Sequence, residues 1–563
     1  MQPKHLSESN SRRPRRTTGL VLCVLIALQV CLMIYLGAQK QEFHIDEIYS
    51  YVFSNSTRAE DFSFADWLLD GWTTGADFDE LTTVQPGEQL RLDAPYYNTA
   101  LDCHPPVYYW ALHIVCSAVP NTFTKWTGLG LNIGLFALTQ VFVYLCSCLL
   151  IKSERLRLAP AALYGFSALA INTTLYIRMY ALLTLLAVVY VYLNLLILRD
   201  GVLMRHVVPA AIVLYLGAMT QYYFLLLAFW AALIVGIRLL AERRIKDALV
   251  YGISAILAVA LMLVSFPYAI EQATGSSTNN IGNEVARSAL DMRLWLYQLY
   301  YLGTEILTGF CFSRKLDLAF LCVLALTVLA VCVRAKRSGS GLLSRIGFDV
   351  WWLMGSFVLT FLTVAKVGGQ YVYLRYIYFA IPLAYLAGLA ALERVAAPAK
   401  EGEGEADHGG KLQAQRLLGL GVAALLAVSV VASVRVCQKG NAAYTYEPAA
   451  KKTAAVAQYD DLPLIVMLAQ DSEGDVELTG NYTKIRLFDQ VYVGSRQEIV
   501  DGGVLADCIG EHGSCLLYIP TNTYWIEGYK RDEVVEELVE KAGVRTAEDV
   551  TDAGFGRYCL VTG

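Results

Sequence analysis

Long apolar runs separated by short polar segments make up most of the chain between residues 18 and 436. A helix needs about 20 apolar residues to cross a membrane, and about eleven runs approach that length. They are 18–38, 127–151, 158–177, 179–198, 207–221, 222–238, 249–269, 316–333, 347–366, 372–392 and 415–436. This pattern predicts an all-α polytopic membrane bundle.

The composition excludes a soluble protein of this length. The chain has 563 residues, of which 56% are hydrophobic and 17% charged, and its mean hydropathy is +0.44; soluble domains carry more charge. Four arginines precede the first run, as in a secretory signal. No small-residue cleavage site follows that run, so we interpret it as a retained membrane anchor.

Basic residues set the expected orientation. Lys and Arg mark cytoplasmic loops, so the arginine cluster places the tail 1–17 in the cytoplasm of a plasma (inner) membrane protein. With the spans above, every second loop is basic and all of these loops fall on the cytoplasmic side. This holds if two other apolar stretches, 104–120 and 293–310, lie in the outer interface without crossing. Counting 104–120 as a span would invert every later loop.

Two polar regions then lie outside the membrane. One is the acidic loop 39–103. It connects two spans and so counts as part of the transmembrane domain, residues 18–436, although it lies outside the membrane. The other is the tail 437–563, where LPLIVML, KIRLFDQVYV, CLLYIP and RYCLVT predict strands and RDEVVEELVEKAG predicts an amphipathic helix. We expect a small extracytoplasmic α/β domain there, with a disulfide between Cys508 and Cys515 left open.

The motif FHIDEIYSY places two adjacent acids, Asp46 and Glu47, directly after the first span. Neighbouring acids on a helix or turn point in different directions, so one can face a cleft and act as a base while the other binds a partner. Solvated loop acids would be the simpler interpretation. His104 follows Asp102 and precedes two prolines that open a short helix, a position suited to a phosphate or a metal, or to a simple helix cap.

Three cations occur at the outer ends of apolar segments: Arg178, Arg375 and Lys366. Charges within spanning segments are costly and usually face a cavity, a partner or an ion, although an arginine near a helix end can also extend to the lipid headgroups. Arginine binds phosphate oxygens in a bidentate manner. Acids on one loop and cations on helix ends together favour an anionic, lipid-linked substrate with a phosphate leaving group.

Tyrosine is abundant, with 35 residues in the chain. Aromatic belts at the membrane interface explain much of this abundance. Stacking on a sugar or a polyprenyl chain is the alternative, and for it we select Tyr108, Tyr180, Tyr222 and Tyr376 as groove residues.

Five elements occur in one order along the chain: HIDEIYSY, HPPVYYW, YIRMYALL, TQYYFLLL and YLRYIYFAIPL. In this order the sequence, over roughly residues 18–392, resembles membrane glycosyltransferases of the C-type fold (GT-C), in particular relatives of protein O-mannosyltransferases and of the aminoarabinose transferase. The resemblance implies transfer of a sugar, with inversion, from a polyprenyl-phosphate carrier to a glycan, lipid or protein acceptor on the outer face. The resemblance implies no partners other than this donor, these acceptors and membrane lipids, and it implies no nucleic acid.

The resemblance also implies roles for individual residues. Asp46 would activate or position the acceptor with support from Glu47, and His104 would lie beside the carrier phosphate. Arg178 and Arg375 match cations of the cavity, whereas Lys366 is included on charge alone. No cofactor is certain; a divalent metal held by Asp46 and His104 is left open.

The main alternative is a transporter or flippase for a lipid-linked or anionic substrate, since intramembrane charges occur in both classes. Transporters usually show internal repeats and charges near the membrane midplane. The sequence shows no repeat, and its notable charges lie at helix ends.

Overall fold

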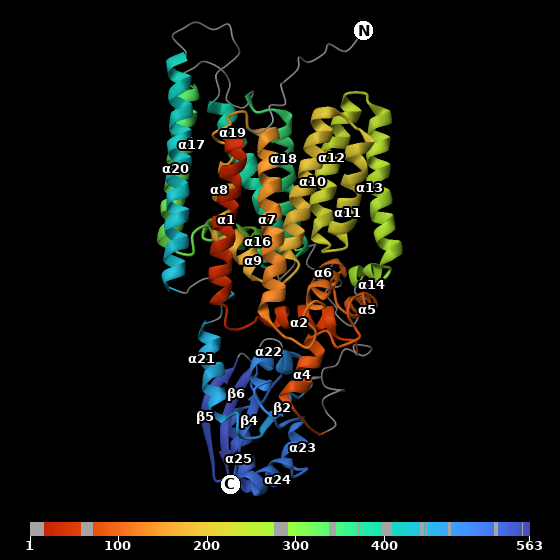
Figure 1. Cartoon of the computed structure of the whole chain (residues 1–563), viewed down its shortest axis with the longest axis vertical. Helices are drawn as coiled ribbons and strands as arrows, with labels where there is room; N and C mark the ends of the chain where they lie inside the picture. Colours follow the sequence, from red (N-terminus) through yellow and green to blue (C-terminus); the bar gives the residue numbers. More distant parts are fainter. Residues whose placement is uncertain are drawn as a thin grey trace.

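The computed structural model describes residues 16–57, 71–274, 291–336, 345–368, 372–396, 408–439, 444–445, 447–470, 475–522, 527–553 and 555–563. Long helices lie side by side along the long axis of the molecule, and a sheet domain lies beyond one end of this bundle (Figure 1). The chain is an integral membrane protein with a helical bundle and a small sheet domain at its C-terminus.

Nine helical segments in the described ranges are long and apolar enough to cross a membrane. They lie within α1 (Arg16–Ala38), α7 (Lys125–Leu150), α10 (Tyr180–Asp200), α12 (Tyr223–Ala241), α13 (Ile245–Ser265), α17 (Arg314–Lys336), α18 (Phe348–Val367), η3 (Leu374–Ala380) continuing into α19 (Ile381–Ala396), and α20 (His408–Lys439). The other two of the eleven expected spans have a different form.

The run 158–177 is divided into two short helices, α8 (Ala159–Gly165) and α9 (Ala168–Leu175). Ser167 causes the break, because its hydroxyl caps α9 by accepting the backbone N–H of Ala170 (3.2 Å). Broken helices are tolerated at membrane depth where protein surrounds them, and Ser167 is buried. The run 207–221 lies mainly in α11 (Met204–Ala218), which has 15 residues.

Several short helices lie towards the end of the bundle that faces the sheet domain (Figure 1). They include α2 (Ile45–Asn55), α4 (Gly75–Thr82), α5 (Asp93–Ala100), α6 (Val107–Cys116), α14 (Tyr268–Thr274) and α16 (Met292–Leu307). Among them, α4 lies beside the sheet and α16 at the level of α9 (Figure 1). α6 and α16, which cover the two stretches expected not to cross, have 10 and 16 residues. Both fall short of the about 20 residues of a span.

The sheet domain contains six strands in the order β1-β3-β2-β4-β6-β5. β2 (Leu464–Met467) runs parallel to β3 (Val491–Gly494) and β4 (Ser514–Pro520), while β6 (Gly556–Thr562) is antiparallel to β4 and to β5 (Thr546–Ala553). Its helices are α21 (Glu447–Val456), α22 (Asp475–Ile485), α23 (Arg496–Val500), α24 (Val504–His512) and α25 (Arg531–Lys541); η5 (Ala457–Tyr459) follows α21. The α/β character of the tail is confirmed. The polar strand β5 was not predicted, and KIRLFDQ belongs to the end of α22 and a turn. Cys508 and Cys515 are free, buried thiols.

The acidic first loop belongs to the same folded unit as the tail. Its strand β1 (Trp72–Thr73) pairs with β3 as the edge of the sheet. Ile48, Val52 and Phe78 from the loop share one hydrophobic core with β2 and β4. The sheet domain therefore packs directly on α2, the helix that carries the two adjacent acids.

Candidate active site

Helix α2 follows α1 after a short turn, and its first turn carries both acids. Nδ1 of His44 accepts the backbone N–H of Asp46 (3.1 Å), and the Glu47 carboxylate accepts the backbone N–H of His44 (2.7 Å), forming a capping box. Burial lowers the pKa of His44 to about 4, so its ring is neutral at physiological pH, as an accepting Nδ1 requires. Successive helical residues are rotated by about 100°, so the two carboxylates face different surroundings.

Glu47 is completely buried and joins three segments. Its Oε2 lies 2.8 Å from Nζ of Lys40, and neither side chain is exposed. Its Oε1 accepts the backbone N–H of Ile177 (2.8 Å). Nζ of Lys40 also donates to the backbone carbonyl of Tyr444 (2.8 Å). Glu47 has no surface for a substrate to reach, and this placement favours a supporting role over a catalytic one.

Asp46, in contrast, keeps 23% of its side chain exposed. Its Oδ2 accepts a hydrogen bond from the hydroxyl of Tyr176 (2.5 Å) and lies 3.3 Å from Nη2 of Arg375. Burial opposes ionisation of this carboxyl, but the guanidinium groups of Arg178 and Arg375 outweigh it and hold the pKa of Asp46 well below its usual range. Asp46 is therefore ionised and partly accessible.

Arg178 lies deeper, with 6% of the residue exposed. Its Nη1 donates to the hydroxyls of Tyr109 (3.1 Å) and Ser50 (3.5 Å), while its buried Nε has no hydrogen-bond partner among the described residues. Its charge lowers the pKa of both Asp46 and Asp102. Arg178 thus acts on both acids through its charge, without a direct ion pair to either in the described structure.

Arg375 lies in η3 beside a group of aromatic rings. Its guanidinium carbon is 4.4 Å from the ring centroid of Tyr373 and 5.7 Å from those of Tyr176 and Tyr376. Tyr180 stacks on Tyr176 with 5.9 Å between centroids. Two of the four selected tyrosines, Tyr180 and Tyr376, therefore lie at the Asp46–Arg375 pair.

His104 forms a second cluster with its neighbours. Its Nδ1 is 2.7 Å from Oδ2 of Asp102 and 3.3 Å from Sγ of Cys103. Possible ligand atoms of these three residues lie within 4.8 Å of one another, and Asp46 is not in this group. Burial raises the pKa of the Cys103 thiol well above its usual value. A divalent metal shared by Asp46 and His104 was left open by the sequence, and in the described structure His104 groups with Asp102 and Cys103 instead of with Asp46.

Lys366, expected at the same site, makes its contacts elsewhere. Its Nζ donates to the backbone carbonyl of Asp291 (3.1 Å) and lies 5.4 Å from the ring centroid of Trp295. Both partners belong to the start of α16. These contacts give Lys366 a structural role in attaching α16 to the end of α18.

The other two selected tyrosines also have local partners. Tyr108 is fully buried, and its hydroxyl donates to Asn132 (3.3 Å), so it is a core residue. The hydroxyl of Tyr222 donates to Gln272 (2.6 Å), whose amide donates to the backbone carbonyl of Asp102 (2.6 Å). Tyr222 therefore helps to hold the loop that carries the His104 cluster.

The sequence interpretation did not include several residues of the site. His44 stands three residues before Glu47, which is the spacing of a capping box, and Tyr176 stands two residues before Arg178. Both residues could therefore have been selected from the sequence. Lys40 follows the first span directly. Tyr444, which stacks on Tyr176 with 4.3 Å between centroids, had no distinguishing sequence signal.

Comparison with protein-family models and with curated proteins found no match. Among solved structures, the chain is similar to ArnT from Cupriavidus metallidurans bound to undecaprenyl phosphate, at 11% identity, with 96% of this chain and 98% of that chain covered and a TM-score of 0.44. It is also similar to the archaeal oligosaccharyltransferase AglB from Archaeoglobus fulgidus in complex with an inhibitory peptide and a dolichol-phosphate, at 11% identity, with 90% and 70% covered and a TM-score of 0.41.

Proposed function

We propose that this protein is a membrane glycosyltransferase that moves a sugar, with inversion, from a polyprenyl-phosphate carrier to an acceptor at the outer membrane surface. The observation that carries the proposal is the ionised, partly exposed Asp46 carboxylate held 3.3 Å from Arg375, with its ionised form stabilised further by the charge of the buried Arg178. The order of the five sequence elements supports the same class of enzyme.

The two arginines suit the phosphate of the donor. A buried N–H without a partner costs about 1–3 kcal/mol, so the unpartnered Nε of Arg178 favours binding of an acceptor atom from outside the chain. Arg375 is 17% exposed at its side chain and can contact the same anion from the accessible side. A carrier phosphate gains negative charge when its bond to the sugar breaks, and both guanidinium groups then stabilise the leaving group.

Asp46 suits the acceptor side of the reaction. Its carboxylate takes the proton of the acceptor hydroxyl or amine, the acceptor atom bonds to the anomeric carbon, and the bond from that carbon to the carrier phosphate breaks. In the ligand-free site the arginines make Asp46 a weak base. A bound phosphate offsets their charge, which raises the pKa of Asp46 towards its usual range and makes it a better base.

The proposed orientation places residues 1–17 in the cytoplasm of the plasma (inner) membrane and the sheet domain outside. The basic loops between spans support it. Labelling of single cysteines in intact cells with a membrane-impermeant reagent tests it. Reaction at exposed sheet-domain positions and protection at 401–410 is the expected result, and the reverse would invert the topology.

Native mass spectrometry of the purified protein tests the donor. A polyprenyl phosphate or its glycosylated form should co-purify with the wild type and be lost from Arg375→Gln. The matched control is Arg238→Gln at the end of α12, where the arginine pairs with Glu242 on the surface. Only bulk phospholipid, equal in all three proteins, would contradict the proposal.

A further inference from the structure

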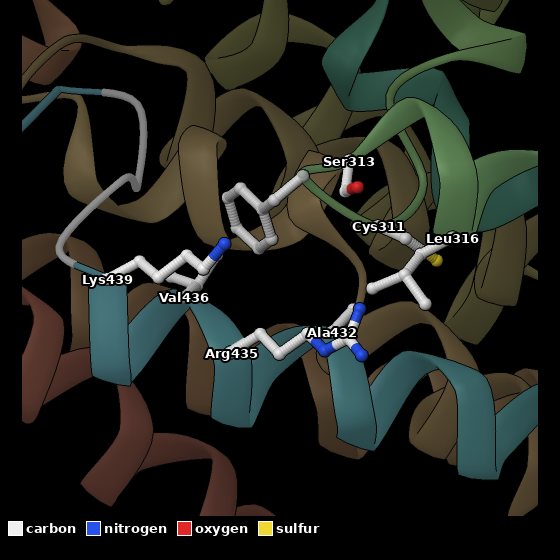
Figure 2. A pocket seen from close by; sticks show the side chains of 8 residues that line it. Cys311, Ser313, Leu316, Ala432, Arg435, Val436 and Lys439 are labelled. Carbon is white, nitrogen blue, oxygen red and sulfur yellow. The ribbon is translucent and has the colours of Figure 1, made fainter.

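A cavity of about 150 Å³ opens between α20 and the segment that leads into α17. Cys311, Phe312, Ser313 and Leu316 form one wall, and Ala432, Arg435, Val436 and Lys439 form the other. Figure 2 shows Arg435 and Lys439 extending from the α20 ribbon, with Ser313 and Leu316 on the opposite side. Residues 432, 435, 436 and 439 recur at helical spacing, so a single face of α20 carries both cations.

Neither cation is neutralised by another residue that the structure describes. Arg435 and Lys439 form no ion pair or hydrogen bond in the described part of the chain, and both are exposed. Two more exposed cations, Arg314 and Lys315, begin α17 beside the cavity and have no partner within the described ranges. The nearby acid, Asp317, is buried, and its Oδ1 accepts the backbone N–H of Cys311 (2.7 Å), while its Oδ2 has no hydrogen-bond partner among the described residues. Asp317 forms no ion pair with either cation in this part of the structure.

The position of these charges is unusual for a membrane protein. The end of α20 that carries Arg435 and Lys439 leads into the sheet domain (Figure 1), the side we assign to the exterior, whereas basic residues normally collect on the cytoplasmic side. Phe312 adopts a left-handed backbone (φ 56°), which is rare for an aromatic residue and recurs at ligand sites. A positive, partly apolar cavity at this level matches the headgroup region of the bilayer.

We propose that the cavity binds the phosphate of an anionic phospholipid from the leaflet next to the sheet domain. Arg435 and Lys439 contact the phosphate oxygens, and the hydroxyl of Ser313 donates a further hydrogen bond. The acyl chains extend along the lipid-facing surfaces of α17 and α20, where Leu318 and Val434 are 63% and 51% exposed. The site is separate from Asp46 and does not depend on the proposed transferase activity.

A lipid is favoured over a soluble anion because four of the eight lining residues, Phe312, Leu316, Ala432 and Val436, have apolar side chains. Such walls add nothing to the binding of free phosphate but suit the glycerol and upper acyl region of a lipid. Cationic side chains near a membrane surface attract anionic lipids by about 1 kcal/mol each.

Native mass spectrometry of the full-length protein in detergent tests the site. The probes are phosphatidylglycerol and phosphatidylcholine with identical acyl chains. The wild type should prefer phosphatidylglycerol, and Arg435→Gln with Lys439→Gln should bind it about 10- to 30-fold more weakly, equivalent to about 1.4–2 kcal/mol. The control double variant, Arg243→Gln with Lys246→Gln, changes exposed cations at the opposite end of the bundle and should bind like the wild type.

Two further experiments distinguish binding of the lipid in the cavity from other sources of binding. Ala432→Leu fills the cavity and keeps both charges, so it should also weaken binding. Unchanged binding would mean that the two cations attract the lipid only by long-range electrostatics and that the cavity does not hold it. Inorganic phosphate at millimolar concentration should not displace the lipid. Displacement by phosphate, or equal phosphatidylglycerol binding by the Arg435/Lys439 double variant and the wild type, would overturn the proposal.

Discussion

The hydroxyl of Tyr176 donates a hydrogen bond of 2.5 Å to the carboxylate of Asp46, from a segment that directly precedes α10. Tyr176 is itself fixed on both faces, since Tyr444 stacks on it at 4.3 Å and Tyr180 at 5.9 Å. The position of the Asp46 carboxylate is therefore set by two segments far apart in the sequence, 176–180 and the one that contains Tyr444. One of them, at Tyr444, leads into the sheet domain.

Tyr176→Phe removes this donor and keeps the ring. The hydrogen bond favours the ionised form of Asp46, so its loss raises the pKa of Asp46. A carboxylate with a lowered pKa stays deprotonated to lower pH, so raising the pKa moves the acid limb of the transfer rate to higher pH. The measurement is kcat/KM against pH with the lipid-linked donor. An unchanged acid limb would separate Tyr176 from the ionisation of Asp46.

Asp46→Asn keeps the shape of the side chain and removes its charge. General base catalysis typically contributes about 10²–10⁴-fold, so the variant should lose that much of the transfer rate while its donor binding remains measurable. Asp93→Asn is the matched control, because Asp93 is an exposed acid that pairs with Arg91 and should retain full activity. Near-normal turnover of folded Asp46→Asn would remove Asp46 from its proposed role.

Hydropathy located most of the helices because a membrane-spanning helix needs a long apolar run. The run 127–151 became α7 (Lys125–Leu150), for example. The same signal did not show that Ser167 divides the run 158–177, since a capping hydroxyl has little effect on a hydropathy average. Strand β1 has two residues and gains its stability from pairing with β3, so its sequence alone carries almost no signal.

Residues of the candidate site could be selected from the sequence where a charged residue interrupts an otherwise apolar segment. Arg178 and Arg375 stand out in apolar sequence, and the structure brings both to Asp46. Lys366 gave the same signal, yet its ammonium binds the backbone carbonyl of Asp291. Sequence shows that a cation near a helix end needs a partner, but it does not identify the partner. Tyr444 could not be distinguished from other interfacial tyrosines, because its role depends on packing against Tyr176.

The buried pair of Lys40 and Glu47 should contribute strongly to stability. Removing one partner of a buried ion pair leaves an uncompensated charge and typically costs about 3–5 kcal/mol. Lys40→Met should therefore lower the midpoint of thermal unfolding in detergent clearly, and adding Glu47→Gln should restore part of the loss. Arg91→Met, which breaks the exposed Arg91–Asp93 pair, should cost less than about 1 kcal/mol. Equal effects of Lys40→Met and Arg91→Met would contradict the buried pair.

The pairing of β1 with β3 can be tested with an engineered disulfide. Trp72 and Tyr492 are direct cross-strand partners, and their rings lie 5.5 Å apart. Opposite residues of an antiparallel pair have Cα atoms about 4.5–5.5 Å apart, within the range that a disulfide bridges. Trp72→Cys with Tyr492→Cys should therefore crosslink on oxidation and change the mobility of the unreduced chain in electrophoresis.

Trp72→Cys with Thr551→Cys is the matched control. Thr551 lies in β5, at the opposite edge of the sheet, and strands are spaced about 4.8 Å apart, so this pair is too distant to bridge. Crosslinking of the first pair alone would show that the acidic loop and the tail form one folded unit.

Removal of the tail after residue 437 would then expose the core face of α2 and disturb Asp46, even though no residue of the sheet touches its carboxylate in the described structure. Equal crosslinking in both pairs would contradict the pairing of β1 with β3.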